Sequence, residues 1–450
     1  MEKNQFWHIY RPHYITLVRL GIPIVMGQLA MVLLSFFDTL MVGHYGTPDL
    51  ASASFVGSLI FLPIMFLMGI TMGLVPLSGA AYGRGDLPLV GAYLRNSVLA
   101  AAVCLTFCML VLVGVYFALP MMGQDPALLP LIRPLFLIHL ASLPFVMVFY
   151  VGKQFTDSIT QTKISMYVIV GGVSLNILLN AVLINGLGPF PEWGVLGAGT
   201  ATLITRILMA LVYLGLLCFH QKLRPYYLAA KQAVWSRRKF MELQKMGWPI
   251  ATQLFLEGSS FALTTVMAGW ISTPTLAAHQ VMLTISQLFF MVYLGVGSAM
   301  TVRISNFVGQ HDYVQVRRIV WAGFHMIMAL AIFNCTVAFL SRYTMAHLFT
   351  EDVHVLALVP TAMLALMLYQ LGDAMQLTYV SALRGIGEVR IVAWTSFVCY
   401  VLVSLPISYT LGVKAGFGLL GIWSAFPISL SLAGLIYYLS YRRFMKRVII

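Results

Sequence analysis

Long apolar runs recur along the chain and are separated by short polar stretches. Because the hydrocarbon core of a bilayer is about 30 Å thick, a helix that crosses it needs about 20 mostly apolar residues. By length and hydropathy, the runs predict twelve membrane-spanning helices, at about 15–42, 52–82, 91–118, 128–152, 163–187, 195–219, 243–270, 278–308, 317–340, 354–380, 389–412 and 417–440. The pattern therefore predicts an all-α integral membrane protein.

The composition excludes a soluble globular protein. Hydrophobic residues make up 60% of the 450 positions and charged residues 9%, which leaves too little polar surface to cover a water-soluble domain. The first 20 residues contain no apolar run, so we expect the first span, rather than a cleavable signal peptide, to direct insertion.

The formal net charge of +13 is a sign of membrane topology rather than of nucleic-acid binding. Lys and Arg lie almost wholly at one set of span ends, with Arg133, Arg342 and Lys414 as the exceptions. Since basic residues favour the cytoplasmic side, we expect both termini in the cytoplasm of a bacterial inner (plasma) membrane. The basic stretch at 221–242 is predicted to be a solvated cytoplasmic connector near anionic lipid headgroups, with a regulatory site as the alternative.

Helix-breaking residues repeat at one fixed offset. Gly21 and Pro23 recur as Gly247 and Pro249, which lie 226 residues later (247 − 21 = 226). About six spans separate the copies, and because this number is even, both halves run in the same direction. The duplication therefore predicts two six-helix bundles related by a pseudo-twofold axis along the membrane normal.

The duplication also predicts how the chain is divided. We expect an N-terminal six-helix lobe at 1–220, the basic connector at 221–242 and a C-terminal six-helix lobe at 243–450. Two bundles related in this way can rock about a central cleft and expose it to each side of the membrane in turn.

Three carboxylates lie inside predicted spans, at Asp38, Glu257 and Asp373. Each costs about 3 kcal/mol near the centre of a bilayer, so a function is needed to explain them. The usual function is to bind a cation or relay a proton within a transporter. Glu257 and Asp373 belong to the same half, so they could converge on one site.

Neighbouring oxygen ligands strengthen this interpretation. Tyr369 precedes Asp373 by four residues and so shares its helix face, and Asn176 and Asn180 have the same spacing on another span. These are hard ligands suited to a small hard cation such as Na⁺, which we place at Glu257 and Asp373. The alternative for each asparagine is an interhelical hydrogen bond that joins two spans.

Three further polar residues are candidates for the cleft. Arg206, the one deep cation that we identify, could face the cleft or lie along a neighbouring helix. His279 and Gln280 end the stretch Ala-Ala-His-Gln, where we interpret His279 as a packing residue rather than a proton carrier.

Other classes of protein fit less well. The sequence shows neither an HExxH metal motif nor a nucleophile paired with a base, so it predicts neither an enzyme nor a cofactor. A channel is possible in principle, but duplicated bundles and intramembrane carboxylates favour alternating access over an open pore.

Several short motifs occur in order along the chain: Gly21-Ile-Pro-Ile, Phe37-Asp-Thr-Leu-Met-Val-Gly43, Ala277-Ala-His-Gln280, Tyr369-Gln-Leu-Gly-Asp373 and Leu383-Arg-Gly385. Through them the chain resembles the multidrug and toxic compound extrusion (MATE) family, nearest its NorM branch. The resemblance implies a twelve-helix antiporter, functional as a monomer in membrane lipid. It would export amphipathic, mostly cationic compounds against an inward flow of Na⁺ or H⁺.

The resemblance also implies roles for individual residues. Its cation site corresponds to Glu257, Tyr369 and Asp373, with Asn176 and Asn180 nearby. Asp38 corresponds to an aspartate associated with proton coupling and drug release. The DinF-like branch tends to have an aspartate where this chain has Asn180, which weakens a two-aspartate proton mechanism in the N-terminal lobe.

The main rival is a flippase of the same broader superfamily that moves a lipid-linked substrate. Such a protein would need a cationic cleft for a pyrophosphate group. With Arg206 as the one deep cation in the prediction, an acidic cleft suits a cationic drug better.

Overall fold

The computed structural model describes residues 3–123, 125–186 and 191–449, so residue 187, the end of the fifth predicted span, lies outside the described part. The described ranges contain helices and no strand. The helices of the first half are α1 Lys3–Tyr45, α2 Thr47–Met72, α3 Leu74–Gly83, α4 Leu87–Ala118, α5 Leu129–Ser158, α6 Thr162–Asn185, α7 Gly194–Phe219 and the connector helix α8 Arg224–Gln232. Short 3₁₀ turns η1 and η2 occupy Leu119–Met121 and Pro126–Leu128.

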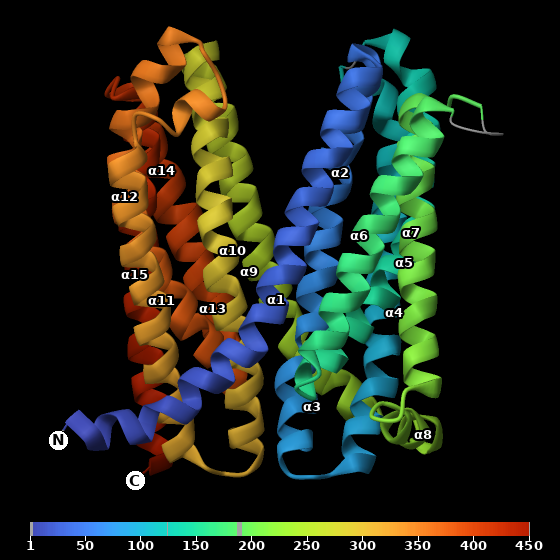
Figure 1. Cartoon of the computed structure of the whole chain (residues 1–450), viewed down its shortest axis with the longest axis vertical. Helices are drawn as coiled ribbons and strands as arrows, with labels where there is room; N and C mark the ends of the chain where they lie inside the picture. The colour runs from blue at the N-terminus through green and yellow to red at the C-terminus, as the bar shows by residue number, and fades with distance from the viewer. Residues whose placement is uncertain (1–2, 124, 187–190, 450) are drawn as a thin grey trace. The chain divides into compact units, whose positions relative to one another are not determined.

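The second half follows the same order (Figure 1). Its helices are α9 Arg237–Ile271, α10 Thr273–Gly309, α11 Tyr313–Ser341, α12 Val353–Ile386, α13 Arg390–Ser396, α14 Leu405–Ile407 and α15 Gly418–Ile449. A 3₁₀ turn, η3, lies at Ala346–Leu348, and two π-helical stretches, η4 Phe397–Ser404 and η5 Ser408–Lys414, flank α14.

The described part of the chain contains twelve helical segments long and apolar enough to cross a membrane, and each overlaps one predicted span. The predicted class, an all-α membrane protein with twelve spans, is confirmed. Two spans are less regular than predicted. The second breaks between α2 and α3, where Pro76 cannot donate to the carbonyl of Met72. The eleventh is largely π-helical around Pro406.

The duplication recurs in the helix boundaries. Asp86 caps α4 by accepting a hydrogen bond of 3.0 Å from the Leu89 amide, and Asp312 caps α11 by accepting one of 3.0 Å from the Gln315 amide. Both members of each pair differ by 226 (312 − 86 and 315 − 89). The repeated offset therefore marks a repeated local structure.

The structure divides the chain into two compact units. One, the C-terminal unit, contains Met1–Val25 and Thr252–Ile450; the other, the N-terminal unit, contains Met26–Ala251. These boundaries differ from the predicted ones near 220 and 243, and the two crossover points again lie 226 residues apart (251 − 25).

Close helix packing explains the shifted boundaries. Within the C-terminal unit, a Cβ atom on Gly295 of α10 would overlap Val25 of α1. Within the N-terminal unit, a Cβ atom on Gly69 of α2 would overlap the backbone of Ala251 in α9. The first helix of each half therefore begins in contact with the second helix of the other half.

The connector is packed rather than solvated along its length, which corrects the prediction. Helix α8 lies against α4 and the end of α7 (Figure 1), and Arg95 Nη1 donates a hydrogen bond of 3.0 Å to the carbonyl of Lys231. The amide of Ser236 donates to Asn96 Oδ1 at 3.1 Å, and the Tyr93 hydroxyl donates to Glu242 at 2.8 Å. These contacts hold residues 221–242 to the N-terminal unit.

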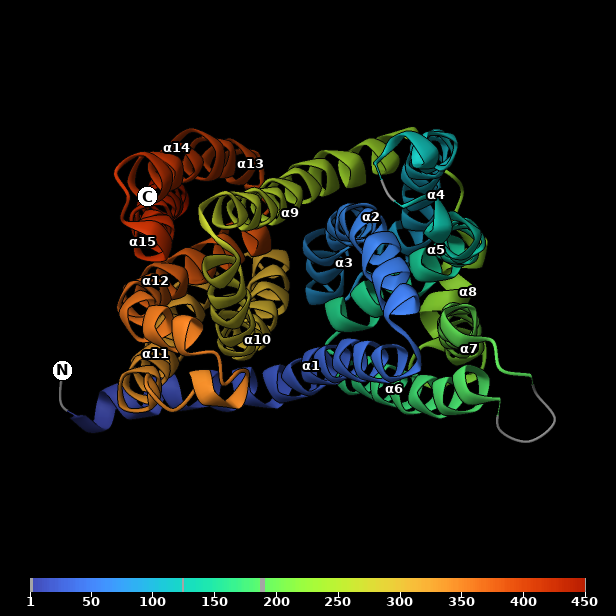
Figure 2. The same ribbon diagram turned by 90° about the horizontal axis from the view of Figure 1, so that it is seen from above.

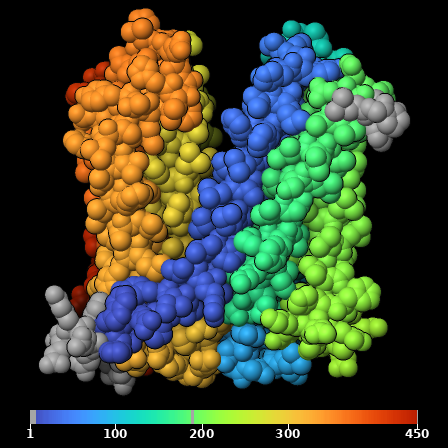
Figure 3. Space-filling view, viewed as in Figure 1, coloured from blue at the N-terminus to red at the C-terminus, as the bar shows by residue number. Residues whose placement is uncertain are grey.

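One helix is central in each unit. Helix α12 packs against α10, α11 and α15, as the view from above shows (Figure 2), and α5 packs against α2, α4 and α7. Helices α6 and α7 lie side by side along one face of the N-terminal unit (Figure 3). A residue on α12 or α5 is therefore surrounded by protein rather than lipid.

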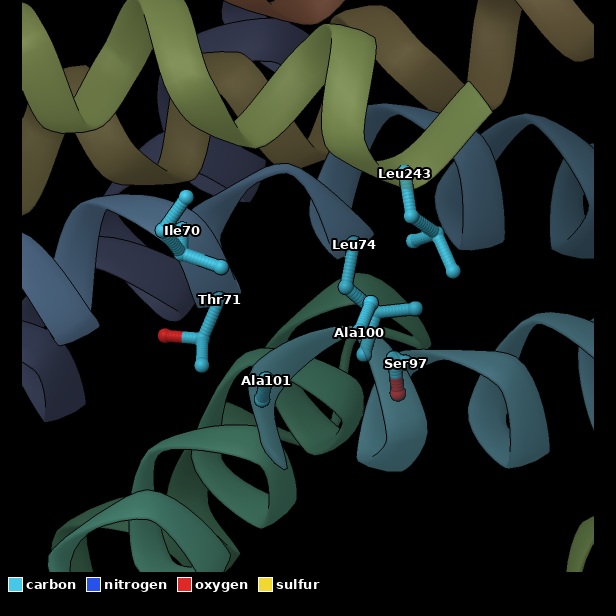
Figure 4. Close-up of a pocket in the computed structure, with 7 residues that line it drawn as sticks. All are labelled: Ile70, Thr71, Leu74, Ser97, Ala100, Ala101 and Leu243. Carbon is cyan, nitrogen blue, oxygen red and sulfur yellow. The ribbon is translucent and has the colours of Figure 1, made fainter. Parts of the chain in front are cut away.

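A small, mostly apolar cavity lies among α2, α3, α4 and α9 of the N-terminal unit (Figure 4). It contains none of the predicted site residues. Its lining is Ile70, Thr71, Leu74, Ser97, Ala100, Ala101 and Leu243.

Candidate functional site

The strongest candidate site lies in the C-terminal unit, between α9 and α12. Asp373 comes from α12 and is 1% exposed, and Glu257 comes from α9 and is half-buried. The two carboxylates are close enough for their charges to interact. Among the described residues, Asp373 Oδ2 has no hydrogen-bond partner. Since a buried carboxylate oxygen without a partner is costly, this atom is suited to accept a proton or bind a cation.

Tyr369 lies one helical turn before Asp373, as predicted. It is 5% exposed, and its hydroxyl is within hydrogen-bonding reach of Ser286 on α10. Its ring meets Trp423 and Phe426 of α15 edge to face, with centroids 6.1 Å apart in both pairs. These contacts orient the tyrosine beside the carboxylate.

Several polar side chains around the two carboxylates were not predicted. Glu257 is within hydrogen-bonding reach of Gln253, one turn earlier on α9, and of Tyr400 in the π-helical stretch η4. Gln376 of α12 donates a hydrogen bond of 3.0 Å to the Tyr400 hydroxyl. The spacing of Gln253 and Gln376 from the carboxylates could have revealed them, because residues three or four apart share a helix face. Tyr400 had no such signal.

Arg384 corrects two predictions. The sequence suggested that it is one of the basic residues at the span ends and that Arg206 is the one deep cation. In the structure Arg384 is 6% exposed, and its Nη2 atom donates a hydrogen bond of 2.7 Å to Gln253 Oε1. Its charge interacts with Glu257. The candidate site therefore contains a resident cation.

A second polar group lies one turn along α12. The Tyr293 hydroxyl donates a hydrogen bond to Gln370, and Asn334 Nδ2 donates to the Tyr293 hydroxyl at 2.8 Å. Gln370 Nε2 has no partner among the described residues, although the side chain is fully buried. This group joins α10, α11 and α12 next to Tyr369.

Asp38 belongs to a different group, within the N-terminal unit. Asn180 Nδ2 donates a hydrogen bond of 2.5 Å to Asp38 Oδ1 and one of 3.0 Å to Asn176 Oδ1. Asn176 Nδ2 lies 3.4 Å from the hydroxyls of Thr202 and Thr205 on α7. The prediction had grouped the two asparagines with Glu257, and the structure groups them with Asp38. The offset could not show this, because it holds only over the first three helices of each half.

Arg206 belongs to the Asp38 group. Its Nη1 atom donates a hydrogen bond of 2.6 Å to Ser142 Oγ on α5, and its charge interacts with Asp38. His139, one turn before Ser142, also lies near this guanidinium.

His279 connects three helices of the C-terminal unit. It is fully buried, Trp423 Nε1 donates to its Nδ1 atom at 3.1 Å, and its Nε2 atom lies 3.2 Å from the Thr265 hydroxyl. Because the tryptophan N–H can only donate, Nδ1 is the acceptor and Nε2 carries the proton. The neighbouring Gln280 is exposed. The geometry of His279 is that of a packing residue.

The comparison with known proteins identifies relatives over nearly the full length. A family model described as MatE matches residues 23–182 and again residues 249–410, and the two matches begin 226 residues apart (249 − 23). The multidrug resistance protein NorM of Photobacterium profundum is 27% identical over 438 residues, covering 95% of both chains. A probable multidrug resistance protein NorM of Xylella fastidiosa is 28% identical over 419 residues, covering 93% of this chain and 89% of that protein.

The fold is also found among solved structures. A mutant of the Vibrio cholerae MATE transporter VcmN has a TM-score of 0.89 with 16% sequence identity, and 98% of both chains is covered. At this identity the likeness concerns the fold alone.

Proposed function

The chain belongs to the MatE family of membrane transporters, and from this premise we propose that it is a cation-coupled antiporter that exports amphipathic, mostly cationic drugs. The observation that carries the proposal is the buried Asp373, which has an unpartnered carboxylate oxygen and lies beside Glu257. The names of the NorM relatives support the drug class.

The proposed mechanism is mutual exclusion through two states of the protein. In the outward-facing state, a cation binds Glu257 and Asp373 and removes the cost of their buried charge. This binding favours the state from which the drug leaves, and release of the cation inside resets the site. A cation that binds one state better than the other is what shifts the equilibrium.

Na⁺ is the first candidate for the coupling ion and H⁺ the second. Glu257, Asp373, Tyr369 and Tyr400 offer carboxylate and hydroxyl oxygens, which are hard ligands for a small cation. Asp38 is proposed to contribute to proton coupling and drug release. Its short hydrogen bond from Asn180 supports a role for the ionised form, because an amide N–H stabilises a carboxylate.

The setting follows from the distribution of charge. We propose that the protein acts as a monomer in the bacterial inner membrane with both termini in the cytoplasm, because Lys and Arg gather at the corresponding span ends.

A flippase for a lipid-linked substrate is the second candidate. Its pyrophosphate group would need free cationic side chains, and Arg206 and Arg384 are both buried or half-buried in the protein. Each of them already interacts with a carboxylate, Asp38 and Glu257 respectively, which supports the export of cations instead.

The test is transport by purified protein in liposomes loaded with a fluorescent cationic dye. A Na⁺ gradient and a pH gradient are applied separately, each with a control in which an ionophore collapses it. We expect dye movement to require one opposing cation gradient and to be fastest with Na⁺. Movement at the same rate without either gradient would contradict antiport and indicate a channel or facilitator.

A further inference from the structure

The cation site of the C-terminal unit contains both signs of charge. Glu257 and Asp373 are accompanied by Arg384, which is 6% exposed and is held by a hydrogen bond of 2.7 Å to Gln253 Oε1. Among the described residues, Arg384 Nε and Asp373 Oδ2 have no hydrogen-bond partner. A buried arginine with an unused donor beside a carboxylate with an unused acceptor is not a closed ion pair.

The charges of the site do not sum to zero. With two carboxylates and one guanidinium, the formal charge is −1 (−2 + 1), because the other polar neighbours, Gln253 and Tyr400, are neutral. The Asp38 group of the N-terminal unit differs, since Asp38 and Arg206 balance each other (−1 + 1 = 0). Each unit thus has a resident arginine, and the C-terminal unit lacks one positive charge.

We propose that Arg384 fixes the charge of this site so that one monovalent cation, and no more, neutralises it in each transport cycle. The proposal rests on the proposed function and deepens it by assigning the coupling ratio to a residue. An uncompensated charge in a low-dielectric environment is costly, and one Na⁺ or H⁺ removes the imbalance completely. A second cation would leave an excess positive charge of the same cost.

The other role open to Arg384 is purely structural, as a clamp between α9 and α12 through Gln253. The two roles differ when charge and hydrogen bonding are changed separately. Arg384→Gln removes the charge but keeps a donor, which leaves a formal charge of −2. Arg384→Lys keeps the charge with different geometry. A structural role predicts changes in rate and stability, whereas a role in charge balance predicts a change in the number of coupled ions.

The experiment measures the coupling ratio in proteoliposomes. The dye is monovalent ethidium, the driving ion is whichever of Na⁺ and H⁺ drives the wild type, and the membrane potential is held at zero with K⁺ and valinomycin. For each imposed dye gradient, the ion gradient that stops net dye flux gives the number of ions per dye. We expect about one for the wild type and Arg384→Lys and about two for Arg384→Gln, because coupling follows the charge to be neutralised. Arg443→Gln, which removes an exposed arginine from α15, is the matched control and should keep the wild-type ratio.

An unchanged ratio in an active Arg384→Gln variant would overturn the proposal. If that variant is inactive, the double variant Glu257→Gln with Arg384→Gln restores the formal charge of −1 and should regain exchange at the wild-type ratio. A double variant as inactive as Glu257→Gln alone would also overturn it, in favour of the clamp. If Glu257→Gln and Asp373→Asn both keep ion-driven efflux, the proposed function itself fails, which is a separate outcome.

Discussion

Asn180 Nδ2 donates a hydrogen bond of 2.5 Å to Asp38 Oδ1, joining α6 to α1 within the N-terminal unit. The same amide also donates to Asn176, so one side chain orients two polar neighbours. We expect Asn180→Leu to destabilise the protein by about 2 kcal/mol, because it leaves a charged group without its donor. Thermal unfolding in detergent measures the loss, and dye efflux should fall with it.

Asn185→Leu is the matched control for this variant. Asn185 is exposed at the end of the same helix and bonds only to the carbonyl of Ala181 in the described structure. Equal stability losses in the two variants would show that the Asp38 contact has no special weight.

The contact between Gly69 and Ala251 tests the packing that sets the unit boundaries. A Cβ atom on Gly69 would overlap the backbone of Ala251, so Gly69→Ala should cost about 1–3 kcal/mol through overpacking. Gly57 lies on the same helix with no atom within 4 Å of such a Cβ, so Gly57→Ala should stabilise by about 0.5–1 kcal/mol. Thermal unfolding compares the two, and losses of equal size would argue against close packing at Gly69.

His279 is expected to act through packing. His279→Leu removes its contacts with Trp423 and Thr265 and should cost about 2 kcal/mol, at about 1 kcal/mol for each hydrogen bond. His354→Leu, at an exposed position, is the control and should have little effect. A His279 variant that unfolds at the wild-type temperature but no longer uses a pH gradient would make this residue a proton carrier instead.

The ion pair between Lys153 and Asp157 is the clearest in the N-terminal unit. Its atoms lie 2.8 Å apart, the side chains are 14% and 5% exposed, and Ser165 donates to the other carboxylate oxygen at 2.7 Å. Lys153→Met should cost about 3–5 kcal/mol, because it leaves Asp157 buried without its counter-charge. Adding Asp157→Leu should recover part of that loss in a double-mutant cycle. No recovery would mean that the two charges are not coupled.

The spans and the duplication could be predicted from the sequence because both depend on local patterns. A run of about 20 apolar residues and a repeated Gly-x-Pro need no knowledge of tertiary contacts. The offset of 226 recurs in the caps Asp86 and Asp312, where a short-range hydrogen bond sets the helix start.

The site could be predicted only in part, since burial depends on which helices meet. Glu257, Tyr369 and Asp373 were found because a carboxylate in an apolar run is unusual. Arg384 was interpreted as a topology charge, since its place near a span end does not reveal that it faces Gln253. Tyr400 lies in a π-helical stretch, and α-helical spacing cannot place it.

The most direct test of the central claim is ion-driven dye efflux from proteoliposomes by Glu257→Gln and Asp373→Asn, compared with the wild type. Thermal unfolding first establishes that both variants are folded. The exchange account predicts that efflux under an opposing cation gradient falls in each variant to the rate seen without a gradient. Wild-type efflux in both variants would contradict it.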